Sequence, residues 1–453
     1  MAVWSVVKLS EFRGAFRMDA EFWRPEYIAI ENTISAMTHA KLGDLVTSIR
    51  KGVFNILAES YVEAGVPFYR SANVGEIIPK DADTVFITER RHAEEHRTAL
   101  RRGDIMLAKT GKEAASVVLA KECNVSQDVV AIRPDRKKIN PFYLAVFLNT
   151  QPGVLQMRRW FQGPVQMHLS LPDTREIFIP LLEPARQKSV EAFVLGSEAA
   201  LKKARDLIVS AETLLVSALG LDHIDLSPSR TYSRPFKDLL AAHRYGAEYY
   251  MPCKQRALDG LAAMPHSTLH DHAPNIRDLW EPASAGKGAM VRNFDLGDAL
   301  EPFLDDTKEP MPAAEVGSTK KQFKAGDVVV SRLRSYLREV AVARTGSGVP
   351  CVGSSEFIVL RPTGKGLSAE AILVYLRCPL VQTILKWSQD GSNHPRFNED
   401  DLMTLPVPDK LREVSPKIER HVQAAIASRQ EAVRLLDNAK TIVQKAILGE
   451  TGS

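Results

Sequence analysis

Two stretches of the chain carry apolar and small residues at the spacing of a long helix that packs against another helix. The first runs from about Pro184 to Leu219 and the second from about Val414 to Leu448. One series recurs every seven residues: Val190, Ser197, Ala204, Ala211 and Ala218 in the first stretch, and Ile418, Ala425, Ala432, Ala439 and Ala446 in the second. The partner series are Phe193, Ala200, Leu207 and Leu214, and then Val422, Leu436 and Val443, with Arg429 as one break. This spacing predicts coiled-coil packing.

Each predicted helix has its best partner in the other, and the many alanines favour a close approach of the two. Gly220 and Gly449 stand where a helix C-terminal cap belongs. About 33 residues at 1.5 Å per residue give a helix of roughly 50 Å, which is long for one domain. We therefore expect an antiparallel pair. The alternative is that each helix packs on its own domain, as an amphipathic surface helix would.

Shorter apolar runs before each long stretch predict mixed domains of short strands and helices. The predicted strands are Asp104–Ala108 and Val117–Ala120, with Val328–Val330 and Val340–Ala343 as their counterparts. The predicted helices are Pro141–Leu148 and Ala371–Leu376. Gly103 and Gly326 each begin a Gly-Asp turn signal directly before a strand.

The same marks occur twice, in the same order, about half a chain apart. The matching segments are Phe16–Pro25 with His243–Pro252, Gly103–Met106 with Gly326–Val329, Val129–Pro134 with Phe357–Pro362, Trp160 with Trp387, Pro180 with Pro406, and Ala218–Gly220 with Ile447–Gly449. A repeat this long indicates a duplicated domain rather than a solenoid unit.

The fold class that follows is α+β with a pseudo-two-fold internal repeat. We predict two similar mixed α/β domains, separated by two long helices that form an antiparallel coiled coil. The predicted boundaries are 1–182 for the first domain, 183–222 for the first long helix, 223–408 for the second domain and 409–453 for the second long helix.

Composition narrows the class of protein further. With 45% hydrophobic residues and a net charge of only +4, the chain is globular rather than disordered. The pI near 8.7 permits contact with nucleic acid without arguing for it. Four scattered cysteines (Cys123, Cys253, Cys351 and Cys378) predict neither a zinc site nor a disulfide framework, so we expect a cytoplasmic protein. No apolar run is long enough to span a membrane, and the N-terminus lacks the pattern of a signal peptide.

This layout resembles the specificity subunit of type I restriction–modification enzymes, over nearly the whole chain. The segments that carry the resemblance are Gly65–Asn73, Leu100–Leu107 with Phe323–Val330, Gly163–Leu169 followed by Ile177–Pro180, and Gly391–Phe397 followed by Leu405–Pro408. One departure is the acidic-Gln pair that usually follows the prolines, which is replaced here by Pro184–Gln187 and Asp409–Glu413.

The resemblance implies a non-catalytic, sequence-specific DNA-recognition subunit of a restriction system. In that family, two target-recognition domains each read one half of a split site on double-stranded DNA, and the spacer helices fix the length of the unread gap. It further implies two docked methyltransferase subunits for DNA methylation and a restriction/translocase subunit for phage defence. S-adenosylmethionine, ATP and Mg²⁺ would then belong to those partners, with no cofactor in this chain.

Candidate DNA-contacting residues are the cations and amides near the Gly-Asp strands and the domain ends, because these groups pair with base edges and phosphates. In the first domain they are Arg70, Asn73, Lys109, Lys112, Arg158, Arg159, Gln166 and His168. In the second they are Lys287, Arg292, Asn293, Arg332, Arg334, Tyr336, Arg338, Asn393 and Arg396. The segment Ser331–Arg338 concentrates three cations and an aromatic residue, and its alternative interpretation is a solvated charged edge.

Two other functions stay open as alternatives. One is a DNA-binding scaffold of another phage-defence system. The other is a self-contained DNA methyltransferase, because Asn140–Tyr143 resembles a methyltransferase loop; without a glycine-rich turn upstream, a helix start explains this segment better. His266, His270 and His272 have a spacing that could bind a metal, but a polar loop is the favoured interpretation.

Overall fold

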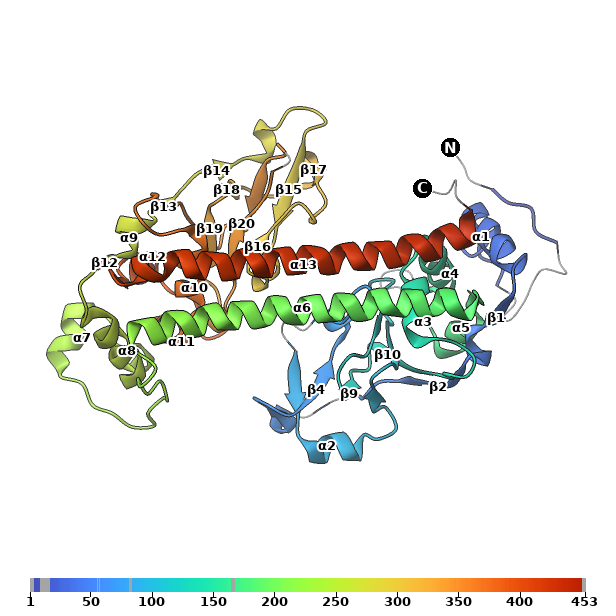
Figure 1. The fold of residues 1–453 in the computed structure, drawn as a ribbon, viewed down its shortest axis with the longest axis horizontal. Helices are drawn as coiled ribbons and strands as arrows, with labels where there is room; N and C mark the ends of the chain where they lie inside the picture. The colour runs from blue at the N-terminus through green and yellow to red at the C-terminus, as the bar shows by residue number, and fades with distance from the viewer. Residues whose placement is uncertain are drawn as a thin grey trace. The chain divides into compact units, whose positions relative to one another are not determined.

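A computed structural model describes residues 4–8, 17–54, 56, 58–80, 84–163, 168–346 and 348–449. The chain divides into two compact units: Met1–Leu201 with Arg429–Ser453, and Lys202–Ser428. The boundary between the units crosses both long helices, so each unit contains one mixed domain and a part of each helix (Figure 1).

The first unit is built from two sheets and a set of short helices. Its helices are α1 (Pro25–Ser35), α2 (Glu89–Glu94), α3 (Pro141–Leu148), α4 (Gln151–Trp160), α5 (Leu171–Glu176), the first part of α6 (Pro184–Leu219) and the last part of α13 (Leu411–Leu448). Its strands are β1 (His39–Lys41), β2 (Val46–Lys51), β3 (Tyr61–Val62), β4 (Val66–Tyr69), β5 (Val85–Ile87), β6 (Leu100–Arg101), β7 (Ile105–Ala108), β8 (Ala115–Val117), β9 (Glu122–Val125), β10 (Val129–Pro134) and β11 (Phe178–Pro180). One sheet has the order β2-β10-β7-β8, the other β3-β5-β4-β9-β6, and β1 pairs with β11.

The second unit repeats this plan. Its helices are the last part of α6, α7 (Phe236–Ala242), α8 (Pro252–Ala262), α9 (Leu269–His272), α10 (Ala369–Arg377), α11 (Pro379–Lys386), α12 (Glu399–Met403) and the first part of α13. Its strands are β12 (His266–Thr268), β13 (Asn275–Ile276), β14 (Leu279–Trp280), β15 (Met290–Phe294), β16 (Phe303–Leu304), β17 (Met311–Pro312), β18 (Lys320–Phe323), β19 (Val328–Ser331), β20 (Val340–Ala343), β21 (Cys351–Gly353), β22 (Phe357–Leu360) and β23 (Pro406–Pro408). The sheets run β13-β22-β19-β20-β16 and β14-β18-β21-β15-β17, and β12 pairs with β23.

The two units share topology down to single strand pairs. In both, the strand that follows the Gly-Asp turn lies between two antiparallel neighbours, β7 between β10 and β8, and β19 between β22 and β20. The other large sheet of each unit contains one parallel pair, β4 with β9 and β15 with β21. The second unit differs in adding β16, which pairs with β20 in parallel. The internal repeat predicted from the sequence is therefore confirmed in the topology, as is the mixed α+β class.

The Gly-Asp turns have the same construction in both units. Gly103 and Gly326 have φ of +88° and +87°, a conformation that favours glycine. Asp104 Oδ2 accepts hydrogen bonds from the backbone of Arg101 (3.1 Å) and from Arg133 Nε (3.1 Å). In the second unit, the Asp327 carboxylate accepts from the backbone of Lys324 (2.9 Å) and from Arg361 Nε (2.8 Å). The buried aspartate thus closes the turn and ties it to the neighbouring strand.

The long helices pair within each unit. In the first unit, Val190 and Val194 of α6 share a hydrophobic cluster with Val443 and Ile447 of α13. In the second unit, Ala211 and Leu215 of α6 share a cluster with Ile418 and Val422 of α13. The first part of α6 therefore meets the last part of α13, and the reverse holds in the other unit, which confirms the expected antiparallel pairing (Figure 1).

Several local predictions change in detail. The strand predicted at Val117–Ala120 is Ala115–Val117 instead, because Val118 bonds to the Gly-Asp turn through Asp104 and Gly103. The histidines at 266–272 lie in β12 and α9 rather than in a loop, since a reciprocal cap between Thr268 and Asp271 starts the helix. The interpretation of Asn140 as a helix start is confirmed, because its side chain accepts from the first N–H groups of α3.

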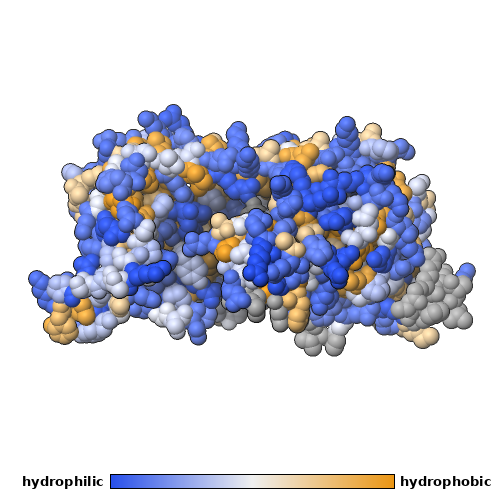
Figure 2. Space-filling model, turned by 90° about the horizontal axis from the view of Figure 1, so that it is seen from below, coloured by the Kyte–Doolittle hydropathy of each residue, from blue (hydrophilic) through white to orange (hydrophobic). Residues whose placement is uncertain are grey.

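Figure 2 shows one face on which hydrophilic side chains predominate and hydrophobic ones form small areas between them. Among the described helices, none combines the length and the apolarity that crossing a membrane requires.

Candidate nucleic-acid interface

The most cationic surface loop of the second unit follows β19 and contains the short helix η9 (Ser335–Leu337). Arg334 and Arg338 flank η9 with φ of +50° and +57°, a left-handed conformation that costs a non-glycine residue about 1–3 kcal/mol. Such a conformation persists only where the surroundings hold it. Here the Arg334 N–H donates to the Pro395 carbonyl at 2.9 Å, which fastens this loop to the segment before α12.

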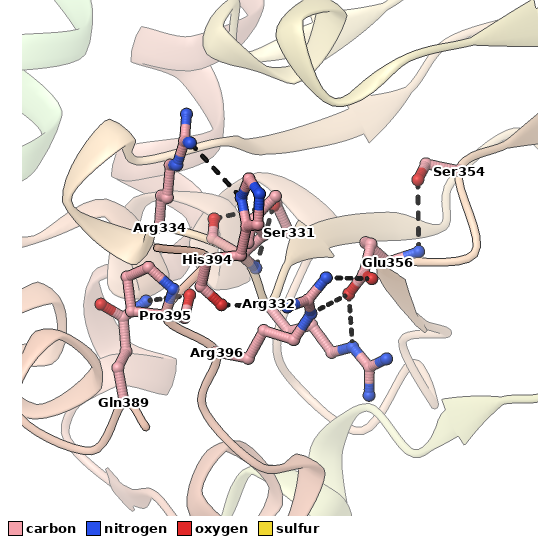
Figure 3. Close-up of polar contacts among 10 residues, drawn as sticks. Ser331, Arg332, Arg334, Ser354, Glu356, Gln389, His394, Pro395 and Arg396 are labelled. Atoms are coloured by element: carbon pink, nitrogen blue, oxygen red, sulfur yellow. Dashed lines mark hydrogen bonds and ion pairs between the residues drawn. The ribbon is translucent and has the colours of Figure 1, made fainter. Parts of the chain in front are cut away.

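Two arginines converge on one carboxylate at this place (Figure 3). Arg332 Nε donates to Glu356 Oε2 at 2.8 Å. Arg396 donates through Nε (3.0 Å) and Nη2 (2.8 Å) to the two oxygens of the same carboxylate. These hydrogen bonds, first those from Arg396 and then those from Arg332, outweigh the effect of burial and lower the pKa of Glu356 to about 2. Glu356 is therefore ionised at any physiological pH.

The remaining side chains of this surface are less constrained. Arg334 Nη2 approaches His394 Nδ1 at 3.4 Å, the long end of a hydrogen bond (Figure 3). Tyr336 is 54% exposed on η9. Asn393 is exposed in the neighbouring loop. We call Arg332, Arg334, Arg396, Glu356 and His394 the arginine cluster.

Arg338 belongs to the same loop but points into the unit. Its Nη2 donates to Glu212 Oε1 of α6 at 2.6 Å and also to the backbone carbonyl of Arg377. Arg377 itself is half-buried, and its desolvation lowers its pKa to about 10. It donates to the carbonyls of Arg338 and Val340 at 3.2 and 3.0 Å. Arg338 thus anchors the loop to the long helix α6. We therefore leave it out of the proposed contact surface, by which we mean the residues proposed to contact DNA.

The first unit has an equivalent place with different side chains. Lys109 follows β7 as Arg332 follows β19, and the backbone of His168 pairs with that of Gln162, as Arg396 pairs with Asp390. A pocket of about 420 Å³ opens here. It is lined by Lys51, Lys109, Gln162, His168, Leu169, Ser170 and Leu171. Gln166, another predicted contact, lies outside the described residues.

Several other predicted contacts of the first unit have partners inside the fold. Asn73 is buried, and its side chain accepts from the Arg70 N–H (3.0 Å) and donates to the Lys80 carbonyl (3.2 Å). Arg159 is buried, with its guanidinium 4.2 Å from the ring centre of Phe22. We therefore leave Asn73 and Arg159 out of the proposed contact surface.

Two more cations of the first unit are held by single partners. Burial and the nearby Lys80 lower the pKa of Lys112, whose Nζ donates to the Val74 carbonyl at 2.5 Å. Arg158 is exposed and forms an ion pair with Glu113 at 2.8 Å. Because Arg158 is exposed, its ion pair with Glu113 does not prevent it from reaching a phosphate. Lys112 is half-buried and therefore less accessible to a phosphate.

The predicted contacts of β15 and the loop before it differ in exposure. Arg292 is 3% exposed and pairs with Asp306 at 2.6 Å, so it too is left out of the contact surface. Asn293 lies half-buried on the same strand. Lys287 is exposed in the preceding loop and stays a candidate for phosphate contact.

Sequence reasoning did not find Glu356 or Glu212. Both are far in the chain from the arginines that they hold, and an acidic residue does not match the negative charge of DNA phosphates. A signal existed for Glu356, because it directly precedes the matched segment that begins at Phe357, as Asp128 precedes Val129. Among the described residues, no group of three or more His, Cys, Asp and Glu side chains could hold a metal ion.

Comparison with known proteins gives structural neighbours only. No family model and no curated protein matches the chain. An S subunit of a type I restriction–modification system from M. genitalium is 13% identical, with 90% of this chain and 95% of that chain covered and a TM-score of 0.40. The HsdS subunit from Thermoanaerobacter tengcongensis is 16% identical, with 91% and 97% covered and a TM-score of 0.29. A chain from a study of complex assembly and conformational transition of the type I R-M system is also 16% identical, with 91% and 98% covered and a TM-score of 0.29.

These neighbours come from the same family that the sequence resembles. Their TM-scores are below 0.5, so these neighbours carry no conclusion about the function of this chain.

Proposed function

We propose that this chain is the non-catalytic, sequence-specific DNA-recognition subunit of a type I restriction–modification complex. The observation that carries the proposal is the duplication. Two domains of similar topology each place a basic side chain directly after the strand of the Gly-Asp turn, Lys109 in one and Arg332 in the other. A protein with two similar readers suits a DNA site that is read in two parts.

The spacing between the two parts would depend on the long helices. Both α6 and α13 are unbroken, with 36 and 38 residues, and they pair in antiparallel fashion within each unit. A paired helix is stiff compared with a flexible linker. The proposed role of the helix pair is to fix the number of base pairs that lie unread between the half-sites.

The same proposal assigns chemistry to other subunits. Two methyltransferase subunits would dock on the similar surfaces that a duplicated chain presents, and a restriction/translocase subunit would join them. S-adenosylmethionine, ATP and Mg²⁺ would act in those subunits. The chain would therefore work in the cytoplasm, on double-stranded DNA, without catalysing a step itself.

Mapping methylated adenines in the source genome, with and without this gene, tests the proposal. We expect one two-part motif with a fixed gap to lose its methylation on deletion, and to regain it when the gene is restored. An unchanged methylation pattern would contradict the proposal in a strain that expresses the gene. Methyl transfer by the isolated chain would favour the self-contained methyltransferase instead.

A further inference from the structure

The arginine cluster occupies a backbone frame that is present in both units. In the first unit, the Lys109 N–H donates to the Asp128 carbonyl (3.0 Å), and the Leu169 N–H donates to the Lys109 carbonyl (3.0 Å). In the second unit, the Arg332 N–H donates to the Glu356 carbonyl (3.1 Å), and the Phe397 N–H donates to the Arg332 carbonyl (3.2 Å).

The frame therefore aligns three positions between the units. Lys109 corresponds to Arg332, Asp128 to Glu356, and His168 to Arg396. At these three positions, each unit has a basic residue, an acidic residue and a second basic residue. The side chains differ between the units.

We propose, on the basis of the proposed function, that Glu356 is a positioning residue that aims the Arg332 guanidinium at a guanine in the half-site read by the second unit. The acid at the middle position would thus set specificity rather than affinity.

The guanidinium of Arg396 is held mainly by Glu356. Its Nε and Nη2 bind the carboxylate side by side, and its Nη1 donates to the His394 carbonyl at 2.9 Å. Each of its three nitrogens has a partner, so Arg396 is poorly placed to read a base. The two-point contact with Arg396 fixes the plane of the Glu356 carboxylate.

Arg332 is held by only one of its nitrogens. Its Nε donates to Glu356 (Figure 3), and among the described residues none accepts a hydrogen bond from Nη1 or Nη2. The side chain is 45% exposed. Because a guanidinium is planar, fixing Nε also restricts the direction of the two terminal amino groups. A pair of parallel N–H donors matches O6 and N7 of guanine in the major groove.

The charge of Glu356 is hard to explain if the cluster serves affinity alone. A carboxylate between two guanidinium groups cancels one positive charge where DNA phosphates would lie, and this weakens non-specific binding. Orientation of a reading arginine gives that carboxylate a use. Lys109, at the equivalent place in the first unit, has a point charge without a planar fork, so the two units would not present the same reader.

The test measures binding of the full chain, assembled with its methyltransferase subunits, to DNA with and without the mapped site. With Glu356→Gln, we expect the ratio of specific to non-specific affinity to fall about tenfold to a hundredfold. Non-specific binding should become more salt-dependent, by up to about one phosphate equivalent, because a negative charge is gone. Replacing the guanines of that half-site by 7-deazaguanine, which lacks N7, should weaken the wild type but affect the variant little.

Two further variants separate positioning from charge and from folding. Asp259→Asn removes one negative charge at an exposed position of α8 and should leave the specificity ratio unchanged. Arg332→Lys keeps the charge but removes the planar fork, so the ratio should fall while the salt dependence stays the same.

Each outcome decides between the two proposals. A wild type with no preference for the mapped site would overturn the proposed function, and this inference with it. A clear wild-type preference that Glu356→Gln and Arg332→Lys both leave intact would overturn the inference alone. An unchanged 7-deazaguanine penalty in Glu356→Gln would also overturn it.

Discussion

A matched pair of buried tyrosines offers a direct energetic test of the duplication. Tyr143 Oη in α3 donates to the Pro180 carbonyl at 2.7 Å, and Tyr375 Oη in α10 donates to the Pro406 carbonyl at 2.6 Å. Both tyrosines are 0% exposed. The first hydrogen bond joins α3 to β11, the last strand before α6. The second joins α10 to β23, the last strand before α13. Tyr143→Phe and Tyr375→Phe remove only the two hydroxyl groups.

The expected cost follows from what each hydroxyl leaves behind. A buried neutral hydrogen bond contributes about 1 kcal/mol, and a carbonyl that loses its buried donor adds to the penalty, so each variant should lose about 1–2 kcal/mol of unfolding free energy. For a unit of this size, 1 kcal/mol lowers Tm by about 2–4 °C. Because the two environments match, the two losses should be similar.

The pH dependence of this difference in unfolding free energy tests whether the tyrosine hydroxyl group contributes to it. Burial raises the pKa of both tyrosines above the ordinary value of 10. The stabilisation is therefore fully present below pH 10 and is lost as pH rises further, because the unfolded tyrosine ionises first. The difference between wild type and either Phe variant should shrink above pH 10.

Denaturant unfolding of the full chain at pH 7.5 and at several values above pH 10 measures both effects. Equal stability of wild type and variant at pH 7.5 would refute the assigned hydrogen bond. A stability difference that stays constant up to pH 11 would contradict the raised pKa of the buried tyrosines.

Two further expectations concern the loop that contains η9. Glu212→Gln breaks the ion pair with Arg338, and because the Arg338 side chain is 37% exposed we expect a loss of at most about 1 kcal/mol. Amide hydrogen exchange across residues 332–338 should nevertheless rise, whereas Glu198→Gln, which breaks the pair with Arg102 in the first unit, should leave that exchange unchanged. Arg334→Ala should lower the salt dependence of DNA binding by about one phosphate equivalent without changing the specificity ratio, and a changed ratio with the same salt dependence would contradict this role.

The sequence predicted the periodic parts of the fold well. The first long helix, α6, runs from Pro184 to Leu219 as expected. Strand β20 begins at Val340 and ends at Ala343, also as expected. The start of α13 lies at Leu411, slightly before the predicted Val414. Heptads, Gly-Asp turns and β-branched runs are local signals, so one sequence is sufficient to place them.

The candidate site was less predictable because its contacts join distant segments. Arg332 and Arg338 are near neighbours in the chain, yet one is exposed beside Glu356 and the other is anchored on Glu212. The left-handed backbone at Arg334 and Arg338 turns the loop between them, and arginine has no sequence signal for that conformation. Burial of Asn73, Arg159 and Arg292 likewise depends on tertiary packing.

The central claim, that the helix pair sets the distance between two DNA readers, is tested by lengthening both helices together. Seven residues inserted between Leu201 and Lys202 and seven between Ser428 and Arg429, where the two helices pass from one unit to the other, keep the heptad phase. One heptad adds about 10 Å, or up to about 3 base pairs of DNA. Methylation mapping of this variant should find both half-sites unchanged and a longer gap between them. An active variant that methylates the original motif with its original gap would contradict the claim.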